Sequence, residues 1–359
     1  MVSPLKRTPQ KTGAGEEGND RPIFVVGCAR SGTTLLEMML HSHPRIAMPP
    51  ETRFLMKLYN RRVNFGDLHD PENRAAVAAD IIDRKGSKFP HLQLDAEAVR
   101  AMIIDGPPTI GSAAGIVFRE YAARHGKSRW GDKRPNYIRY IEPLLAMFPD
   151  AQIVHIIRDG RDCVASLKRM PWWRNPFRAS VNKWIEAIEA GNAAREKLRT
   201  DQYYELRYED LVVNPEQELR GLCRFLGETF DAAMLEPYKT APLVLPQHKL
   251  EGHHQRLQLK EINTGSVGKW REELSATEAA LVEAMAAKQL SQYGYALSNQ
   301  DVDLPQKRVG RIAELIAETA EKTSHYQQAD ARRQRRYGQP VQALLTKGQI
   351  ELFQQRSQA

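Results

Sequence analysis

The sequence is poor in cysteine and contains no long apolar segment. Its 359 residues include three cysteines, Cys28, Cys163 and Cys223, which are widely spaced and form no CxxC pair. This odd, scattered set argues against a disulfide framework and favours a reduced, cytoplasmic chain. No stretch reaches the roughly 18 apolar residues of a membrane span, and the first twenty residues lack the apolar core of a signal peptide. We therefore expect no membrane span and no secretory route.

The sequence also lacks the usual signatures of nucleic-acid and metal-binding domains. The formal net charge of +8 and pI of about 9.3 favour anionic partners, although a solvated basic surface explains them equally well. No RNP, zinc or helix-turn-helix pattern is present, so nucleic acid is not an expected partner. The histidines of "HSHP" (residues 41–44) have no third ligand nearby, and we predict no metal site.

Apolar runs that end in glycine or polar turns, and are followed by helical patterns, predict the fold class. Such units are "PIFVVG" (22–27) with "TTLLEMMLHSH" (33–43), the strand 152–157 with a helix over 160–169, and the strand 202–208 with a helix from "NPEQELRGLCRFLG" (214–227). Strands that alternate with helices predict an α/β protein with a central parallel sheet flanked by helices. Ligands are then expected at the carboxyl ends of the strands.

Composition divides the chain into three parts. Residues 1–20 are rich in Gly, Lys and Glu, and we expect them to be disordered. Residues 21–300 form one domain, in which 55–128 is mostly helical with a Pro and Gly break around 105–111. Residues 301–359 form a basic, helical C-terminal extension. Three roles are open for its apolar stripe: packing on its own domain, contact with a second copy in a homo-oligomer, or contact with an anionic surface.

The stretch "GCARSGTT" (Gly27–Thr34) has the glycine spacing of a phosphate-binding loop but lacks its lysine. Thr33 stands where the lysine of such loops reaches the β- and γ-phosphates. The glycines and the helix start still offer backbone N–H groups, and Arg30 supplies a cation within the loop. The loop therefore suits a phosphosulfate, whose terminal group carries less charge and requires no metal. A plain strand-to-helix turn is the other interpretation.

Four segments in order resemble a known family. They are residues 21–55, which include "GCARSGTTLL" and "PPETRF", residues 131–167, which include "GDKRP" and "RDGRDCVAS", residues 203–227, which include "RYEDLV", and residues 263–274, "NTGSVGKWREEL". Together they resemble the sulfotransferases that use 3′-phosphoadenosine-5′-phosphosulfate (PAPS), and in particular the protein-tyrosine sulfotransferases. The resemblance implies a P-loop-like sulfotransferase fold and metal-free, in-line transfer of a sulfuryl group to an acceptor hydroxyl.

The same resemblance implies roles for individual residues. Glu51 would be the catalytic base, and Arg30 and Lys133 would stabilise the transferring group. The residues expected to bind PAPS are Arg30, Ser31, Gly32, Thr33 and Thr34 at the 5′-phosphosulfate, Arg158 and Ser166 at the 3′-phosphate, Tyr208 near the nucleoside, and Ser266 and Lys269 in a segment that closes over the cofactor.

Two positions depart from the tyrosine-modifying branch. Met170 replaces an arginine near the 3′-phosphate, where Lys168 or Arg169 could compensate, and Gly268 replaces a catalytic serine, for which Ser266 is a candidate substitute. The expected acceptor is the hydroxyl of a small molecule, glycan, lipid or peptide. Two other function classes are a P-loop kinase acting on a small molecule and a non-catalytic binder that uses the basic tail.

Overall fold

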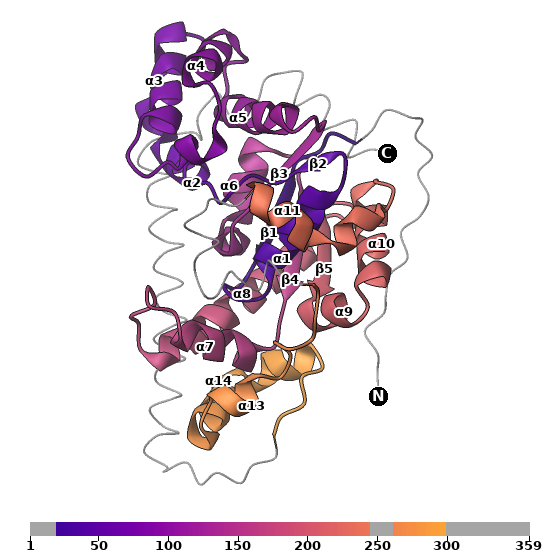
Figure 1. Ribbon diagram of the computed structural model, residues 1–359. Helices are drawn as coiled ribbons and strands as arrows, with labels where there is room; N and C mark the ends of the chain where they lie inside the picture. The colour runs from indigo at the N-terminus through magenta and orange to yellow at the C-terminus, as the bar shows by residue number, and fades with distance from the viewer. Residues whose placement is uncertain (1–18, 245–260, 299–359) are drawn as a thin grey trace.

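The computed structural model describes residues 19–244 and 261–298, and its centre is a sheet of five parallel strands (Figure 1). The strands are β1 (Ile23–Gly27), β2 (Ile46–Ala47), β3 (Arg129–Lys133), β4 (Gln152–Ile157) and β5 (Tyr203–Arg207). They are ordered β2-β3-β1-β4-β5, so that Ile23 of β1 pairs with Gly131 on one side and with Gln152 on the other. The predicted α/β class with a parallel sheet is confirmed.

Helices connect the strands and cover both faces of the sheet. The α-helices are α1 (Thr33–Ser42), α2 (Leu55–Arg61), α3 (Pro71–Ile82), α4 (Ala96–Asp105), α5 (Ile110–Arg124), α6 (Ile141–Met147), α7 (Gly160–Lys168), α8 (Phe177–Lys197), α9 (Tyr208–Val213), α10 (Pro215–Leu226), α11 (Pro237–Val244), α13 (Trp270–Glu273) and α14 (Ala276–Gln292). Short 3₁₀ helices are η1 (Arg62–Asn64), η2 (Phe89–Leu92), η3 (Pro135–Tyr140) and η4 (Ala232–Leu235). The three predicted strand-helix units correspond to β1 with α1, β4 with α7, and β5 with α10.

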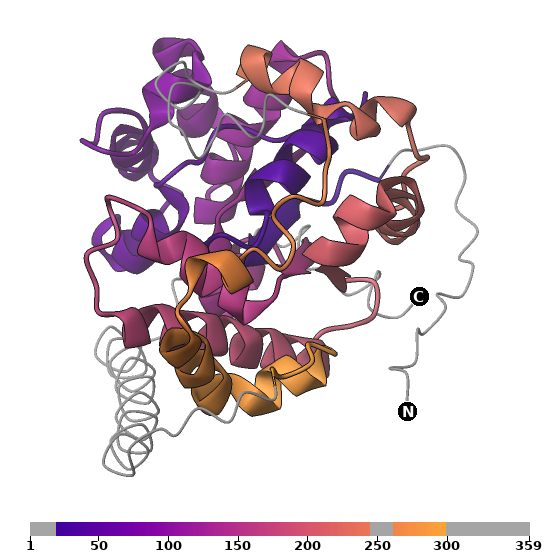
Figure 2. The ribbon, with the colours of Figure 1, turned by 60° about the horizontal axis from the view of Figure 1, so that its bottom comes forward.

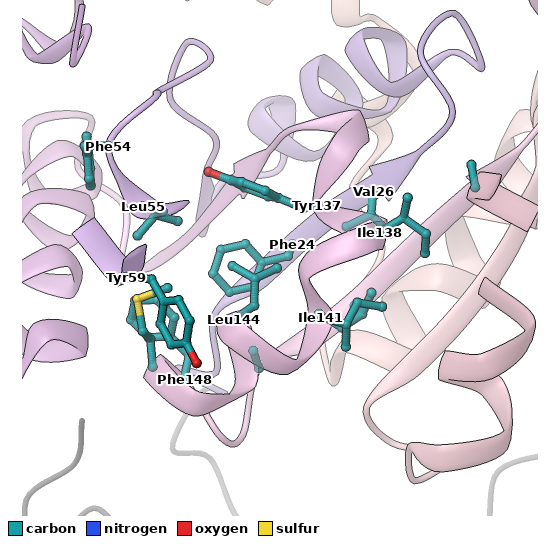
Figure 3. Close-up of a cluster of buried hydrophobic side chains, with 14 of the residues drawn as sticks. Phe24, Val26, Phe54, Leu55, Tyr59, Tyr137, Ile138, Ile141, Leu144 and Phe148 are labelled. Atoms are coloured by element: carbon teal, nitrogen blue, oxygen red, sulfur yellow. The ribbon is translucent and has the colours of Figure 1, made fainter. Parts of the chain in front are cut away.

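Alternation along β1 gives the sheet two apolar faces. Phe24 and Val26 face a core formed with α5, α6 and α8, whereas Ile23 and Val25 face a core formed with α1, α9 and α10. Figure 3 shows part of the first core, where Phe24 lies among Tyr137, Leu144 and Phe148. Burial on both faces explains why β1 and β4 read as continuous apolar runs.

A helical excursion, residues 48–128, lies between the neighbouring strands β2 and β3 and contains α2 to α5. Asp70, Asp95 and Thr109 cap α3, α4 and α5 through side-chain bonds to backbone N–H groups. Figures 1 and 2 both place the excursion on the opposite side of the sheet from α10. Its helical content and its break between Asp105 and Ile110 agree with the sequence prediction.

The sequence did not predict β3, because "RWGDK" has no apolar run. All five residues of β3 are nevertheless buried, and their polar groups bond to neighbouring segments. The predicted disorder of residues 1–20 and the predicted helical extension 301–359 lie outside the described residues, apart from Asn19 and Asp20. Within the described ranges, no helix combines the length and the apolar character that crossing a membrane requires.

Candidate functional site

Three neighbouring strands end at the same edge of the sheet and carry the polar residues singled out above. The phosphate loop (residues 28–32) follows β1, Arg158 follows β4, and Lys133 is the last residue of β3. Because β1 lies between β3 and β4, its loop is flanked by the other two strand ends. The carboxyl edge of a parallel sheet is where this fold class binds ligands.

The backbone of the phosphate loop adopts conformations that few side chains tolerate. Arg30 has φ 76° and Gly32 has φ 94°, both in the left-handed region. A Cβ at Gly32 would lie 2.4 Å from the Tyr208 ring, so only glycine fits. The hydroxyl of Ser31, which is fully buried, donates to the Cys28 carbonyl at 2.7 Å and thereby closes the turn. Strained, over-determined backbone of this kind is typical of functional loops.

Helices α1 and α7, which follow β1 and β4 at this edge, have different N-termini. Helix α1 begins after Gly32 without a cap from any described side chain, so its first backbone N–H groups can donate to an anion. Helix α7 is capped by Asp159, whose carboxylate accepts from the backbone N–H of Arg161 at 2.9 Å. Asp159 therefore already satisfies one of the N–H groups at the start of α7.

Arg30 joins the two predicted anion sites. Its Nε donates to the Ser166 hydroxyl at 3.0 Å, and its carbonyl accepts from Arg158 Nη1 at 3.0 Å. Arg158, two residues before α7, and Ser166, within α7, thus both contact Arg30 of the phosphate loop. Arg30 therefore contacts both residues predicted at the second anion site.

This part of the site gathers positive charge that carboxylates balance only in part, since Arg158 Nη2 lies 3.7 Å from Asp162 Oδ2. Burial lowers the pKa of the Arg30 guanidinium, and the nearby cations of Arg158 and Arg169 lower it further. The Nε of Arg158 is buried and has no hydrogen-bond partner among the described residues. Both observations are expected of a pocket whose anionic ligand supplies the missing acceptor oxygens, and they fit a nucleotide with two anionic ends.

Tyr208 and Ser266 lie against Arg158. The Arg158 guanidinium lies 4.7 Å from the centre of the Tyr208 ring, and it also donates to the Ser266 carbonyl. Burial raises the pKa of Tyr208, against the effects of the Arg158 charge and of a hydrogen bond with the Ser266 side chain. These contacts place both residues beside Arg158, at the predicted 3′-phosphate site.

The late loop (residues 261–269) is anchored to α7 by Asp162. The Asp162 carboxylate accepts from Gly268 N at 2.9 Å and from Trp270 N at 2.8 Å. Gly268 has φ 69°, and a Cβ there would lie 2.6 Å from Arg271 Nη1. Glycine adopts this left-handed conformation at little cost, whereas a serine at this position would be strained. Figures 1 and 2 show α13 and α14, which follow the loop, packed beside α7.

The basic residues around Met170 pair with carboxylates of α13 and α14. Lys168 lies 2.7 Å from Glu278, and Arg169 lies 2.9 Å from Glu273. The predicted cofactor ligand Lys269 also approaches Glu273, at 3.7 Å. Of the two candidate substitutes for the missing arginine, Arg169 is the one whose charge acts on Arg30.

Lys133 and Glu51 form a second cluster on the β3 side of the phosphate loop. Lys133 Nζ lies 3.2 Å from Glu37 Oε2, 3.8 Å from Glu51 Oε2 and 3.4 Å from Thr34 Oγ1. Although burial opposes its charge, the carboxylates of Glu37 and Glu51 hold the pKa of Lys133 above its ordinary value. Glu51 Oε1 also lies 3.6 Å from Arg134 Nε. The structure thus brings Glu51, Lys133 and the start of α1 together.

Sequence reasoning missed several residues of this cluster. Glu37 follows Thr34 by three positions, so the helical period would have placed both on one side of α1. Arg134 directly follows Lys133 and could have been found by proximity. Thr52 and Asp132, which bond to each other at 3.0 Å, come from distant parts of the chain and leave no local signal.

The described side chains bear on the histidines of "HSHP" and on other possible metal ligands. In residues 19–244 and 261–298, no three His, Cys, Asp or Glu side chains are grouped as metal ligands. The rings of the "HSHP" histidines bond to backbone instead: His41 Nδ1 lies 2.8 Å from the Met48 carbonyl oxygen, and His43 Nε2 lies 2.8 Å from that of Thr229.

The parallel sheet and the glycine-containing loop between β1 and α1 define a P-loop-like α/β protein. The model of the sulfotransferase family matches residues 22–232, and the chain belongs to this family. The predicted family is confirmed.

Curated relatives include enzymes of the tyrosine-modifying branch. The chain is 26% identical over 257 residues to a protein-tyrosine sulfotransferase of Drosophila melanogaster, a match that covers 69% of this chain and 46% of the relative. It is 25% identical over 309 residues to protein-tyrosine sulfotransferase A of Caenorhabditis elegans, covering 83% and 72% respectively. The chain therefore spans only about half the length of the Drosophila relative.

Solved structures support the fold. The sulfotransferase domain of the Synechococcus PCC 7002 olefin synthase superposes with a TM-score of 0.55 at 23% identity, over 81% of this chain and all of that domain. The sulfotransferase domain from the curacin biosynthetic pathway gives 0.53 at 23% identity, over 79% of this chain and all of that domain. The predicted P-loop-like sulfotransferase fold is confirmed.

Proposed function

We propose that the protein transfers a sulfuryl group from PAPS to a hydroxyl group of an acceptor. The observation that carries the proposal is the contact between the two anion sites, in which Arg30 donates to Ser166 at 3.0 Å and accepts from Arg158 at 3.0 Å. Family membership gives this geometry its chemical meaning, because a PAPS molecule has a 5′-phosphosulfate and a 3′-phosphate on one ribose.

The residues of the site would divide between the two ends of PAPS. The phosphate loop, the open N-terminus of α1 and Thr34 would hold the 5′-phosphosulfate. Arg158 and Ser166 would hold the 3′-phosphate, and Tyr208, Ser266 and Lys269 would lie along the nucleoside and the late loop. Ser31 would contribute by closing the loop, since its hydroxyl is bonded to the Cys28 carbonyl.

PAPS, when bound, supplies an activated sulfuryl group. Glu51, whose side chain is 29% exposed, would accept the proton of the acceptor hydroxyl. Lys133 would place its positive charge between the base and the start of α1, where it can stabilise charge on the transferring group. Arg30 would neutralise charge that develops on the departing phosphate. Only interactions that strengthen in the transition state raise the rate.

The kinase alternative has weaker support. Thr33 is buried at the first turn of α1 in place of the lysine that a P-loop kinase uses, and the arginine-lined second anion site has no counterpart in that motif. Titration calorimetry separates the two. Tight binding of ATP with magnesium, without binding of adenosine 3′,5′-bisphosphate, would favour the kinase.

The acceptor is proposed as a hydroxyl on a small molecule, glycan, lipid or peptide. The decisive assay incubates the full-length protein with PAPS and cell extract, and searches by mass spectrometry for compounds that gain one sulfuryl group. Release of adenosine 3′,5′-bisphosphate should accompany the gain, and omission of PAPS is the control. The cytoplasmic location and the homo-oligomer remain predictions from the sequence.

Arg158→Ala is expected to weaken binding of adenosine 3′,5′-bisphosphate about ten- to hundredfold, because it removes a charge-assisted contact with the 3′-phosphate. The variant also loses the Arg158 bond to the Ser266 carbonyl and the Arg158 pair with Asp162, whereas the Asp162 bonds to Gly268 N and Trp270 N still hold the late loop. Calorimetry measures the affinity, and Arg220→Ala, at a side chain that is 52% exposed, is the control. A loss of turnover at unchanged affinity would contradict the assignment.

A further inference from the structure

Asp132 is a carboxylate without exposed surface at the end of β3. Its Oδ2 accepts from Thr52 Oγ1 at 3.0 Å and from the Tyr137 hydroxyl at 2.8 Å, and its Oδ1 accepts from Lys133 N at 3.0 Å. Burial raises the pKa of Asp132 to about 6, against the effect of the hydrogen bonds from Tyr137 and Thr52. Burying a carboxylate costs free energy. A protein with an apolar residue of similar volume at such a place is often at least as stable. Stability alone therefore does not explain a carboxylate here.

The bond from Thr52 to Asp132 joins two segments that are 80 residues apart in sequence. Thr52 directly follows Glu51, and Lys133 directly follows Asp132. The two reactive side chains are therefore each one residue away from the same hydrogen bond. Lys133 Nζ and Glu51 Oε2 lie 3.8 Å apart.

The segment that carries Glu51 depends on such links for its position. The base loop (residues 48–54) contains no helix or strand between Ala47 and Leu55. Its Arg53 N–H donates to the Ser87 carbonyl at 3.1 Å. This bond ties the loop to a later part of the helical excursion and not to the sheet. The buried Thr52 hydroxyl bonds the loop to β3, and thus to the strand that carries Lys133.

We propose that Asp132 is a positioning residue, which fixes the base loop on β3 and so sets the place of Glu51 relative to Lys133. The inference rests on the proposed function for its meaning, because positioning matters only if Glu51 acts as the base. A displacement of about 1 Å at a reacting group can cost on the order of a hundredfold in rate. Asp132 itself does not touch the reacting atoms.

Two matched variants separate positioning from stability. Thr52→Val and Tyr137→Phe each remove one hydroxyl donor from the same Asp132 oxygen. Thr52 belongs to the base loop, whereas Tyr137 belongs to η3 and has a hydrogen bond with that loop at the Thr52 side chain. Figure 3 shows the Tyr137 ring within the buried cluster, with its hydroxyl at the edge. Both changes should lower thermal stability by similar amounts, because each leaves Asp132 with one donor fewer.

Thr52→Val is expected to lower kcat about ten- to hundredfold without weakening binding of adenosine 3′,5′-bisphosphate. Tyr137→Phe should keep kcat within about threefold of wild type, and Thr52→Ser, which retains the hydroxyl, should restore it. Equal losses of kcat in Thr52→Val and Tyr137→Phe, or wild-type kcat in Thr52→Val, would overturn the proposal.

Amide hydrogen exchange gives a readout that does not need activity. Thr52→Val should speed exchange in residues 48–54, whereas Tyr137→Phe should leave exchange of that segment unchanged. An inactive wild-type protein would refute the proposed function but would still allow this comparison. Unchanged exchange of the base loop in Thr52→Val would refute the role of Asp132 by itself.

Discussion

Glu51→Gln is expected to lower kcat for sulfuryl transfer by about 10² to 10⁴, the range typical of a lost general base. Glutamine keeps the size of the side chain but cannot accept the hydroxyl proton. Affinity for adenosine 3′,5′-bisphosphate should stay near wild type, because the charged neighbours of Glu51 are Lys133 and Arg134. Neither belongs to the arginine cluster, which consists of Arg30 and Arg158. Steady-state rates at saturating PAPS, combined with calorimetry, measure both quantities.

The control for this prediction is Glu142→Gln. The Glu142 side chain is 82% exposed and pairs only with Lys197 among the described residues, on the surface. This variant should match wild type in both measurements. Wild-type turnover in Glu51→Gln would remove Glu51 from the role of base, and the proton acceptor would then have to be sought elsewhere in the cluster around Lys133.

Arg129→Met is expected to lower the free energy of unfolding by about 3 to 5 kcal/mol, the usual cost of breaking a buried ion pair from one side. Arg129 is fully buried at the start of β3. Its guanidinium donates to the Arg21 carbonyl at 2.9 Å, to the Leu226 carbonyl at 2.8 Å and to Glu228 at 3.0 Å, and also to Gln152. Burial lowers the pKa of Arg129 to about 10, although Glu228 opposes this effect. Equilibrium unfolding in urea measures the loss.

Arg45→Met provides a matched control, because Arg45 pairs with the same carboxylate. Its Nε lies 3.0 Å from Glu228 Oε2, but its side chain is 41% exposed. Exposed pairs are worth about 0 to 1 kcal/mol, so this variant should lose little stability. Both variants lie at the start of the strands, opposite the nucleotide edge, and should keep wild-type nucleotide affinity while folded. Equal losses in the two variants would contradict the role given to burial.

The arginine cluster could be predicted from the sequence because its signals are local. The apolar runs of β1 and β4 and the helices after them have clear periods, and parallel strands place their carboxyl ends at one edge. Arg30 and Arg158 each lie at such an end, so their proximity followed from the fold class. The family resemblance then assigned the chemistry to each position.

The cluster on β3 could not be predicted in the same way. The strand "RWGDK" has charged residues where a buried strand is expected to be apolar, and these residues are buried only because distant segments satisfy them. Asp132 needs Thr52 and Tyr137, and Arg129 needs Leu226 and Glu228. Partners of this kind are brought together by tertiary packing, which overrides local preference.

The helical excursion begins just before Glu51 and returns to the sheet at β3, which ends in Lys133. None of the residues proposed to grip the donor nucleotide lies in it, since these belong to β1 with α1, to α7, to Tyr208 and to the late loop. One contiguous stretch of the gene therefore encodes the proposed base but none of the residues proposed to hold the donor. Substitutions confined to this stretch are expected to change which hydroxyl is modified while donor affinity is kept.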